Sequence, residues 1–271
     1  MNPLPQGGSA TARGIRKLLN LQTFIVQGSV HSFIKFPELT WEIKQLRHLK
    51  LRSFYLPDPP SSSIDGERNL VWSNIQPVSG LLPYCCPKKV LSRIQNIKKL
   101  CIRGHVYDYP MHEEVMDFRE IVDLPQLETL SITVDCYHVS HWSSRSHKLT
   151  VCVPSATQFP TKLKKLKLVG TRLAWEDLNI IGHWPNLEVL KLKPNACRGL
   201  EWRPIEGGFR MLRFLLIEAT EKGRCPICRI PALSCRVSIQ LPIKQEEARL
   251  LTGTGYRFSF NVCRSKKEKK Q

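Results

Sequence analysis

The sequence predicts an α/β fold in which stacked repeats each contribute one short strand to a parallel sheet. Three observations support this prediction. The phrase L-x-x-L-x-L, with Ile, Phe or Val in place of some leucines, occurs seven times within 271 residues. Most copies follow one another at a regular interval, and an apolar residue followed by Pro precedes several of them. A single such phrase is weak evidence, but seven copies in register define a repeat.

The repeated phrases extend from residue 21 to residue 217. They are Leu21-Phe24-Val26, Leu46-Leu49-Leu51, Ile97-Leu100-Ile102, Leu127-Leu130-Ile132, Leu163-Leu166-Leu168, Leu187-Leu190-Leu192 and Leu212-Leu215-Ile217. A degenerate copy, Leu70-x-Trp72, is expected to fill the gap between the second and third. Each x-L-x-L portion predicts a strand whose alternate side chains point inward and are buried only when neighbouring units stack. The pattern therefore predicts a leucine-rich-repeat solenoid, or horseshoe, with the parallel β-sheet on its concave face.

The segments between the strands are expected to form an irregular or briefly helical convex side. Phe36-Pro37, Leu124-Pro125, Phe159-Pro160 and Trp184-Pro185 mark where such segments end, because Pro fixes φ and favours an extended residue before it. A brief helix is expected within 173–181, whereas 53–69, 74–92 and 134–158 are predicted to be loops. The domain prediction is a disordered extension over 1–14, about eight repeats over 15–219, and a poorly ordered basic tail over 220–271.

The composition is that of a folded protein with a basic surface. Apolar residues make up 42% and charged residues 24% of the chain, which is ordinary for a globular protein. The 41 Lys and Arg exceed the 23 Asp and Glu and give a net charge of +18, which favours an acidic partner. The sequence shows no hydrophobic leader and no stretch that predicts a membrane span. Ten irregularly spaced cysteines favour the cytoplasm, with the nucleus as the alternative because 264–271 is basic.

Exposed strand positions predict the binding surface. Equivalent positions of stacked strands form columns about 4.8 Å apart. One column is expected to be Ile25, Lys50, Val71, Cys101, Ser131, Lys167, Lys191 and Leu216, and the next Gln27, Arg52, Ser73, Arg103, Thr133, Val169, Lys193 and Glu218. The candidate binding residues are Lys50, Arg52, Lys98, Lys99, Arg103, Lys164, Lys165, Lys167, Lys191 and Lys193. They either bind an acidic protein surface or only block edge pairing and add solubility. Nucleic acid is disfavoured, because these columns lack aromatic residues for base stacking.

Residues 159–219 resemble a known family. The resemblance rests on LAWEDLNIIGHWPNLEVLKL at 173–192, NACRGLEW at 195–202 and FLLIE at 214–218, with KLLNLQT at 17–23, WEIKQLRHL at 41–49 and IKKL at 97–100. These stretches resemble the repeat region of late blight resistance protein homologues from nightshade-family plants, and the resemblance covers about residues 15–219. It implies the recognition domain of an intracellular immune receptor. The acidic surface that it binds would then belong to a pathogen protein or to a receptor's nucleotide-binding domain.

The chain departs from the plan of that family. Full-length members carry a coiled coil and a nucleotide-binding switch before the repeats, but this sequence contains no G-x-x-x-x-G-K-[ST] loop. Residues past about 220 look unrelated to the family, as a truncated gene, a splice product or a misjoined gene model would explain. We expect a protein–protein interaction scaffold implicated in defence against pathogens. The alternatives are a generic leucine-rich-repeat adaptor with an unrelated acidic partner, and a non-functional receptor remnant.

Catalytic and metal sites are not expected. Cys225 and Cys228 have the spacing of a metal-binding pair, but Cys235 and Cys263, which could complete four thiolates, are single cysteines. The segment from His112 to Met116 has Met where the second histidine of a zinc motif must stand. A further histidine cluster is more typical of a solvated loop and comprises His138, His141 and His147. We therefore expect no enzyme activity, no cofactor, no bound metal and no small-molecule substrate.

Overall fold

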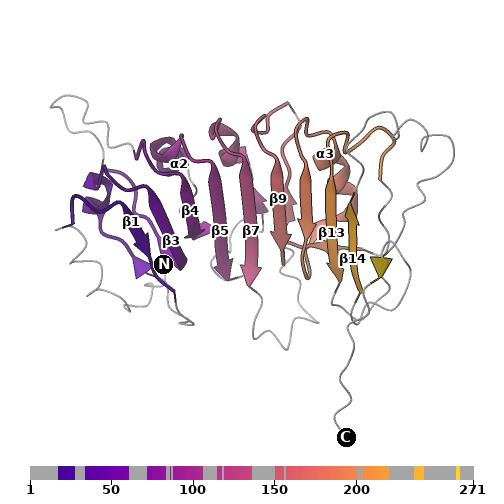
Figure 1. Ribbon diagram of the computed structural model, residues 1–271, viewed down its shortest axis with the longest axis horizontal. Coiled ribbons are helices and arrows are strands. Elements are labelled where there is room, and N and C mark those ends of the chain that lie inside the picture. The colour runs from indigo at the N-terminus through magenta and orange to yellow at the C-terminus, as the bar shows by residue number, and fades with distance from the viewer. Residues whose placement is uncertain are drawn as a thin grey trace, which may run out of the picture.

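A computed structural model describes residues 18–27, 34–60, 72–83, 86, 88–105, 115–117, 119–135, 150–155, 157–199, 202, 204–219, 235–240 and 261–262. Its main feature is an 11-stranded sheet in the order β1-β3-β4-β5-β7-β9-β11-β13-β14-β15, with β2 beside β3 (Figure 1). All neighbours from β1 to β13 are parallel, and β14 and β15 are antiparallel additions at one edge. The chain is therefore α/β, with a mostly parallel sheet and few helices.

The strands of the main sheet are short. They are β1 (Thr23–Ile25), β2 (Ile34–Lys35), β3 (His48–Tyr55), β4 (Pro77–Leu81), β5 (Lys99–His105), β7 (Thr129–Asp135), β9 (Lys165–Val169), β11 (Val189–Leu192), β13 (Phe214–Ala219), β14 (Cys235–Gln240) and β15 (Asn261–Val262). Two small parallel pairs lie outside this sheet: β10 (Leu173–Ala174) with β12 (Cys197–Arg198), and β6 (Val115–Asp117) with β8 (Thr150–Cys152).

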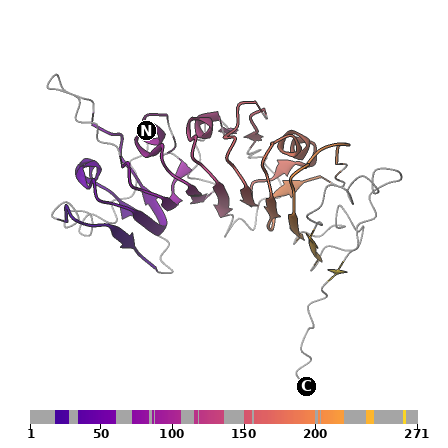
Figure 2. The same ribbon diagram turned by 45° about the horizontal axis from the view of Figure 1, so that its top comes forward.

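Short helical segments lie along one side of the row of strands, as Figure 2 shows. They are η1 (Glu38–Glu42), α2 (Lys88–Leu91), η3 (Ser92–Ile94), η5 (Arg119–Asp123), η6 (Trp175–Asp177) and α3 (Leu178–Gly182). The brief helix predicted within 173–181 is confirmed by η6 and α3. In the described part of the chain, no helix has the length and hydrophobicity needed to cross a bilayer.

The core lies between the strands and the helical segments and is built from the repeated phrase. All three apolar residues are buried in each copy from Leu46 to Ile217, whereas Val26 of the first copy is 39% exposed. A turn precedes the phrases: the amide of Leu46 donates to the carbonyl of Ile43, and equivalent bonds form in later coils. Two of the apolar residues before Pro, Phe159 and Trp184, stack between neighbouring coils with their ring centroids 3.6 Å apart.

The third strand lies later in the chain than the sequence pattern placed it. Val78 of β4 is the residue that aligns with Leu49 of β3 and Leu100 of β5, so the predicted copy Leu70-x-Trp72 is wrong. Trp72 is buried in the turn before β4, where its carbonyl accepts a hydrogen bond from the amide of Ile75. The segment 74–92, predicted to be a loop, contains β4, α2 and the beginning of η3.

The cause of this error is Gly80. It stands where the third apolar residue is expected, at φ +97°, and the register with both neighbouring strands shifts beside it. The exposed column therefore continues through Ser79, which pairs with Lys50 and Cys101. Ser73 lies in the turn before β4, and Val71 lies outside the described residues.

The last parallel strand is covered by an antiparallel strand from the C-terminal region. All six residues of β13 align with β14, from Phe214 opposite Gln240 to Ala219 opposite Cys235. This pairing satisfies backbone groups that the edge of β13 would otherwise expose. The predicted extension over 1–14 and most of the predicted tail over 220–271 lie outside the described residues, so the predicted domain boundaries stay predictions.

Candidate binding surface

The strand side chains that point away from the buried leucines form a second face of the sheet, which we call the open face. From β5 to β13 the register is continuous: Leu100, Leu130, Leu166, Leu190 and Leu215 align. Because side chains alternate along a strand, the residues on either side of these leucines share the open face. They form two rows, Lys99-Thr129-Lys165-Val189-Phe214 and Cys101-Ser131-Lys167-Lys191-Leu216.

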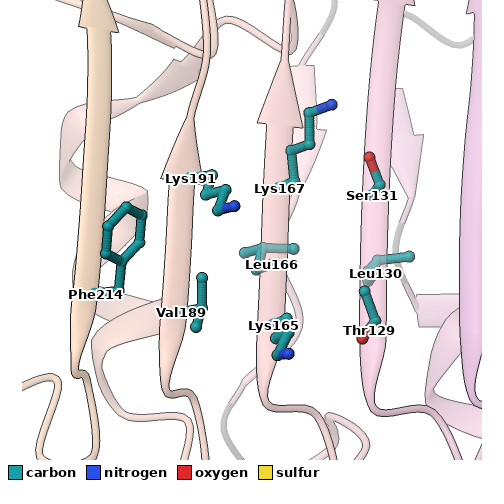
Figure 3. A pocket seen from close by; sticks show the side chains of 9 residues that line it. All are labelled: Thr129, Leu130, Ser131, Lys165, Leu166, Lys167, Val189, Lys191 and Phe214. Carbon is teal, nitrogen blue, oxygen red and sulfur yellow. The ribbon is translucent and has the colours of Figure 1, made fainter. Parts of the chain in front are cut away.

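The open face contains a hollow of about 350 Å³ over β7, β9, β11 and β13 (Figure 3). It is lined by Thr129, Leu130, Ser131, Lys165, Leu166, Lys167, Val189, Lys191 and Phe214. Three of these residues supply ammonium groups, two supply hydroxyl groups, and Val189 and Phe214 supply apolar surface. Lys191 Nζ lies 5.5 Å from the centroid of the Phe214 ring, which is within cation–π range.

The three lysines of the hollow have no acidic partner in the described part of the chain. None of the ion pairs found there includes Lys165, Lys167 or Lys191. Lys167 and Lys191 occupy directly paired positions of β9 and β11, and Figure 3 shows their side chains pointing in different directions. An acidic ligand would therefore meet three positive charges that no described carboxylate neutralises.

Two other candidate residues are already paired within the chain. Arg103 Nε lies 3.3 Å from Asp135 Oδ2, and Lys193 Nζ donates a 2.7 Å hydrogen bond to Glu218 Oε1. Both carboxylates come from the next parallel strand of the sheet, β7 for Arg103 and β13 for Lys193. These pairs reduce the positive charge that Arg103 and Lys193 present to a partner.

Lys98 and Lys164 lie in a row in which the charge alternates. Each stands just before a strand, where its carbonyl accepts two amides of the next coil: those of Glu128 and Thr129 for Lys98, and those of Glu188 and Val189 for Lys164. The equivalent position in successive coils reads Lys98, Glu128, Lys164, Glu188 and Arg213. The acidic members stand between the basic ones, so this row carries less net positive charge than its lysines alone predict.

The remaining candidates are exposed residues outside the hollow. Lys50 and Arg52 lie on β3, and Lys99 begins β5. The structure thus brings together Lys165, Lys167 and Lys191. Lys50 and Arg52 lie beyond the irregular strand β4, and Thr129 of β7 stands between Lys99 of β5 and Lys165 of β9.

Three residues of the hollow were missed from the sequence: Thr129, Val189 and Phe214. All three immediately precede the central leucine of their phrase and were therefore available from the same strand alternation. The two columns predicted from the sequence use the residues one and three positions after that leucine. Of the residues one position before it, the predicted binding surface includes only the lysines. Phe214 is the aromatic residue that those columns lack.

The rejected catalytic and metal motifs lie mostly outside the described residues, which include none of Cys225, Cys228, Cys263, His112, His138, His141 or His147. Within the described ranges, no group of three His, Cys, Asp or Glu is placed to hold a metal ion. Burial raises the pKa of the Cys197 thiol far above its ordinary value, and the nearby Asp177 carboxylate raises it further. A thiol that stays protonated is a poor nucleophile.

Comparison with known proteins gives one informative likeness. No family model matches the chain. Over 211 residues the chain is 26% identical to a late blight resistance protein homologue of Solanum demissum. The chain has a distant plant resistance-protein relative. The match covers 75% of this chain but only 16% of that relative, so the chain spans a small part of its length.

The matched protein is described as a resistance protein, and this likeness relates the chain loosely to plant disease resistance. It agrees in part with the family resemblance seen in the sequence. The matched stretch gives no information about the function of the rest of that protein.

Proposed function

We propose that the chain is a leucine-rich-repeat solenoid whose open face is concave and binds an acidic protein surface during defence against pathogens. Eight successive parallel strands, β1 to β13, support the repeat architecture. Residues 187–197, LEVLKLKPNAC, fit the extended pattern L-x-x-L-x-L-x-x-N/C-x-L except for Cys at the last position. One coil earlier, buried Thr171 occupies the asparagine position, and its hydroxyl donates a 2.7 Å hydrogen bond to the carbonyl of Ala196 in the next coil. The relative from Solanum demissum supports the defence role.

The observation that carries the binding proposal is the hollow. Its three lysines lie together without a described carboxylate beside them, while Arg103 and Lys193 on the same sheet are paired. Three charges that no described carboxylate neutralises line one depression that also contains apolar surface, and this favours a binding surface over charge that serves only solubility. The partner is the surface of a pathogen protein or of a receptor's nucleotide-binding domain. We propose that the chain acts in the cytoplasm by binding alone, without catalysis.

The test is charge reversal on the two sides of the sheet. The variant Lys167→Glu/Lys191→Glu changes the hollow, and Lys88→Glu/Lys89→Glu makes the same change in net charge on α2, on the helical side. Binding of fluorescein-labelled polyglutamate is followed by anisotropy at rising NaCl, and near-UV circular dichroism checks folding. Native protein should bind, and salt should weaken the binding. The hollow variant should lose binding and the α2 variant should keep it; equal binding by both variants would refute the proposal.

A further inference from the structure

The hollow has two halves of different chemistry. Over β7 and β9 it presents the hydroxyls of Thr129 and Ser131 and the ammonium groups of Lys165 and Lys167. Over β11 and β13 it presents the apolar side chains of Val189 and Phe214. Lys191 lies between the halves, with its ammonium group near the Phe214 ring (Figure 3). A ligand that fills the hollow therefore meets cations at one end and hydrocarbon at the other.

The apolar half is only partly covered by the described chain. Val189 and Phe214 are both of intermediate exposure although each is an apolar residue in the middle of a sheet. Part of both side chains is therefore in contact with water, beside the Lys191 ammonium group, whereas Leu216 is buried. Burying the exposed part of Val189 and Phe214 under an apolar ligand group is favourable, because the free energy gained is proportional to the apolar area removed from water.

The spacing of the two halves limits the ligand. The column of Lys165 and Lys167 and the residue Phe214 are two strand intervals apart, which is about 9.6 Å at about 4.8 Å per strand. An extended peptide advances about 3.3 Å per residue. A carboxylate bound above β9 therefore places the backbone about three residues further along above Phe214. Because alternate side chains of an extended peptide share a face, the side chain that meets Phe214 is two or four residues from the carboxylate.

We propose that the hollow selects an acidic peptide segment that carries a bulky apolar side chain two to four residues from its carboxylates. This inference rests on the proposed function and specifies its ligand. The carboxylates bind Lys165, Lys167 and Lys191, and the apolar side chain packs on Val189 and Phe214. A second copy of this chain is a poor occupant, because its net charge of +18 repels the same lysines. Single-stranded nucleic acid requires a series of aromatic platforms, and the hollow has one aromatic residue.

The experiment uses two fluorescein-labelled peptides of equal charge, Glu-Glu-Ser-Ser-Phe and Glu-Glu-Ser-Ser-Ser, with the full chain. Affinities are measured by fluorescence anisotropy. Native protein should bind the Phe peptide about tenfold more tightly, the effect of burying a modest apolar area. Phe214→Thr, which keeps a residue that favours strands, should bind the two peptides equally. Val189→Thr, a smaller change in shape, should reduce the preference and provides a second measurement if Phe214→Thr fails to fold.

Charge variants separate this inference from the proposed function. Lys167→Gln/Lys191→Gln should weaken binding of both peptides, whereas Lys88→Gln/Lys89→Gln on the helical side should change neither. Equal affinity of native protein for the two peptides would overturn the apolar selection and leave acidic binding standing. Failure to bind either peptide or polyglutamate would overturn both proposals. Tighter binding of an oligothymidine than of the Phe peptide would also refute the inference, in favour of a nucleic-acid partner.

Discussion

Replacing Gly80 with Ala tests a tightly constrained backbone position of the sheet. Gly80 lies in β4 at φ +97°, and an added Cβ would lie 2.2 Å from the carbonyl oxygen of Leu51 and 2.9 Å from the carbonyl carbon of Arg52. These atoms belong to the backbone of the neighbouring strand β3, so a change of rotamer cannot relieve the contact. The strands would have to separate or change register.

The expected loss of stability has two parts. An alanine at positive φ costs about 1–2 kcal/mol, and forcing packed backbone apart adds about 1–3 kcal/mol. Together they give about 2–5 kcal/mol, a large share of the 5–15 kcal/mol, roughly, that stabilises a typical folded protein. Gly207 provides a matched control: its φ is +70°, but an added Cβ would meet nothing within 4 Å. Gly207→Ala should therefore cost only the first part.

Urea unfolding followed by tryptophan fluorescence measures both variants. Trp41 and Trp72 are fully buried, with ring centroids 4.7 Å apart, so their emission reports on the loss of packing near β3 and β4. The unfolding midpoint of Gly80→Ala should fall well below that of Gly207→Ala, with similar slopes. If the two midpoints coincide, the close approach of β3 and β4 at Gly80 does not constrain the sheet and the reasoning is refuted.

Three further predictions concern the core, a buried thiol and the edge of the sheet. Leu190→Ala should lower the free energy of unfolding by about 2–5 kcal/mol, because Leu190 is fully buried between coils; a loss below about 1 kcal/mol in urea would contradict its place in the core. Because the pKa of Cys197 is raised in the folded state, the unfolded chain ionises first as pH rises past the ordinary thiol pKa of about 8.5. Native protein should therefore lose stability above that pH faster than Cys197→Ala, and identical pH slopes would count against a buried thiol. A chain ending at residue 219 lacks β14 and exposes the edge of β13, so it should self-associate in light scattering; a truncated protein that stays monomeric would exclude β14 as an edge cover.

The position of the core could be predicted from the sequence because it depends on a local pattern. Alternation along a strand decides which residues point inward, and repetition decides which strands are neighbours. The buried leucines from Leu46 to Ile217 follow directly from these two rules. The antiparallel pairing of β14 does not, because residues 235–240 lack the repeated phrase.

Part of the candidate site could not be predicted, because side-chain pairing depends on which strands meet. Asp135 neutralises Arg103 from the end of β7, and no sequence separation predicts that contact. Glu218 follows Lys193 in the expected column, but only the structure shows that their side chains form an ion pair. Composition predicts a basic face, whereas register decides which of its charges stay unpaired.

The same dependence on register explains why the hollow lies over β7 to β13. The pairing of β4 with β3 and β5 shifts after Ser79, at Gly80, so residues of β4 up to Ser79 stay in line with their neighbours and those beyond do not. From β5 onward each strand continues the register of the last, and equivalent residues stack at about 4.8 Å. Such regular stacking places Lys165 and Lys167 of β9 and Lys191 of β11 along one depression that ends at Phe214 of β13. The binding residues are therefore selected by the regularity of the strands that carry them as much as by their charge.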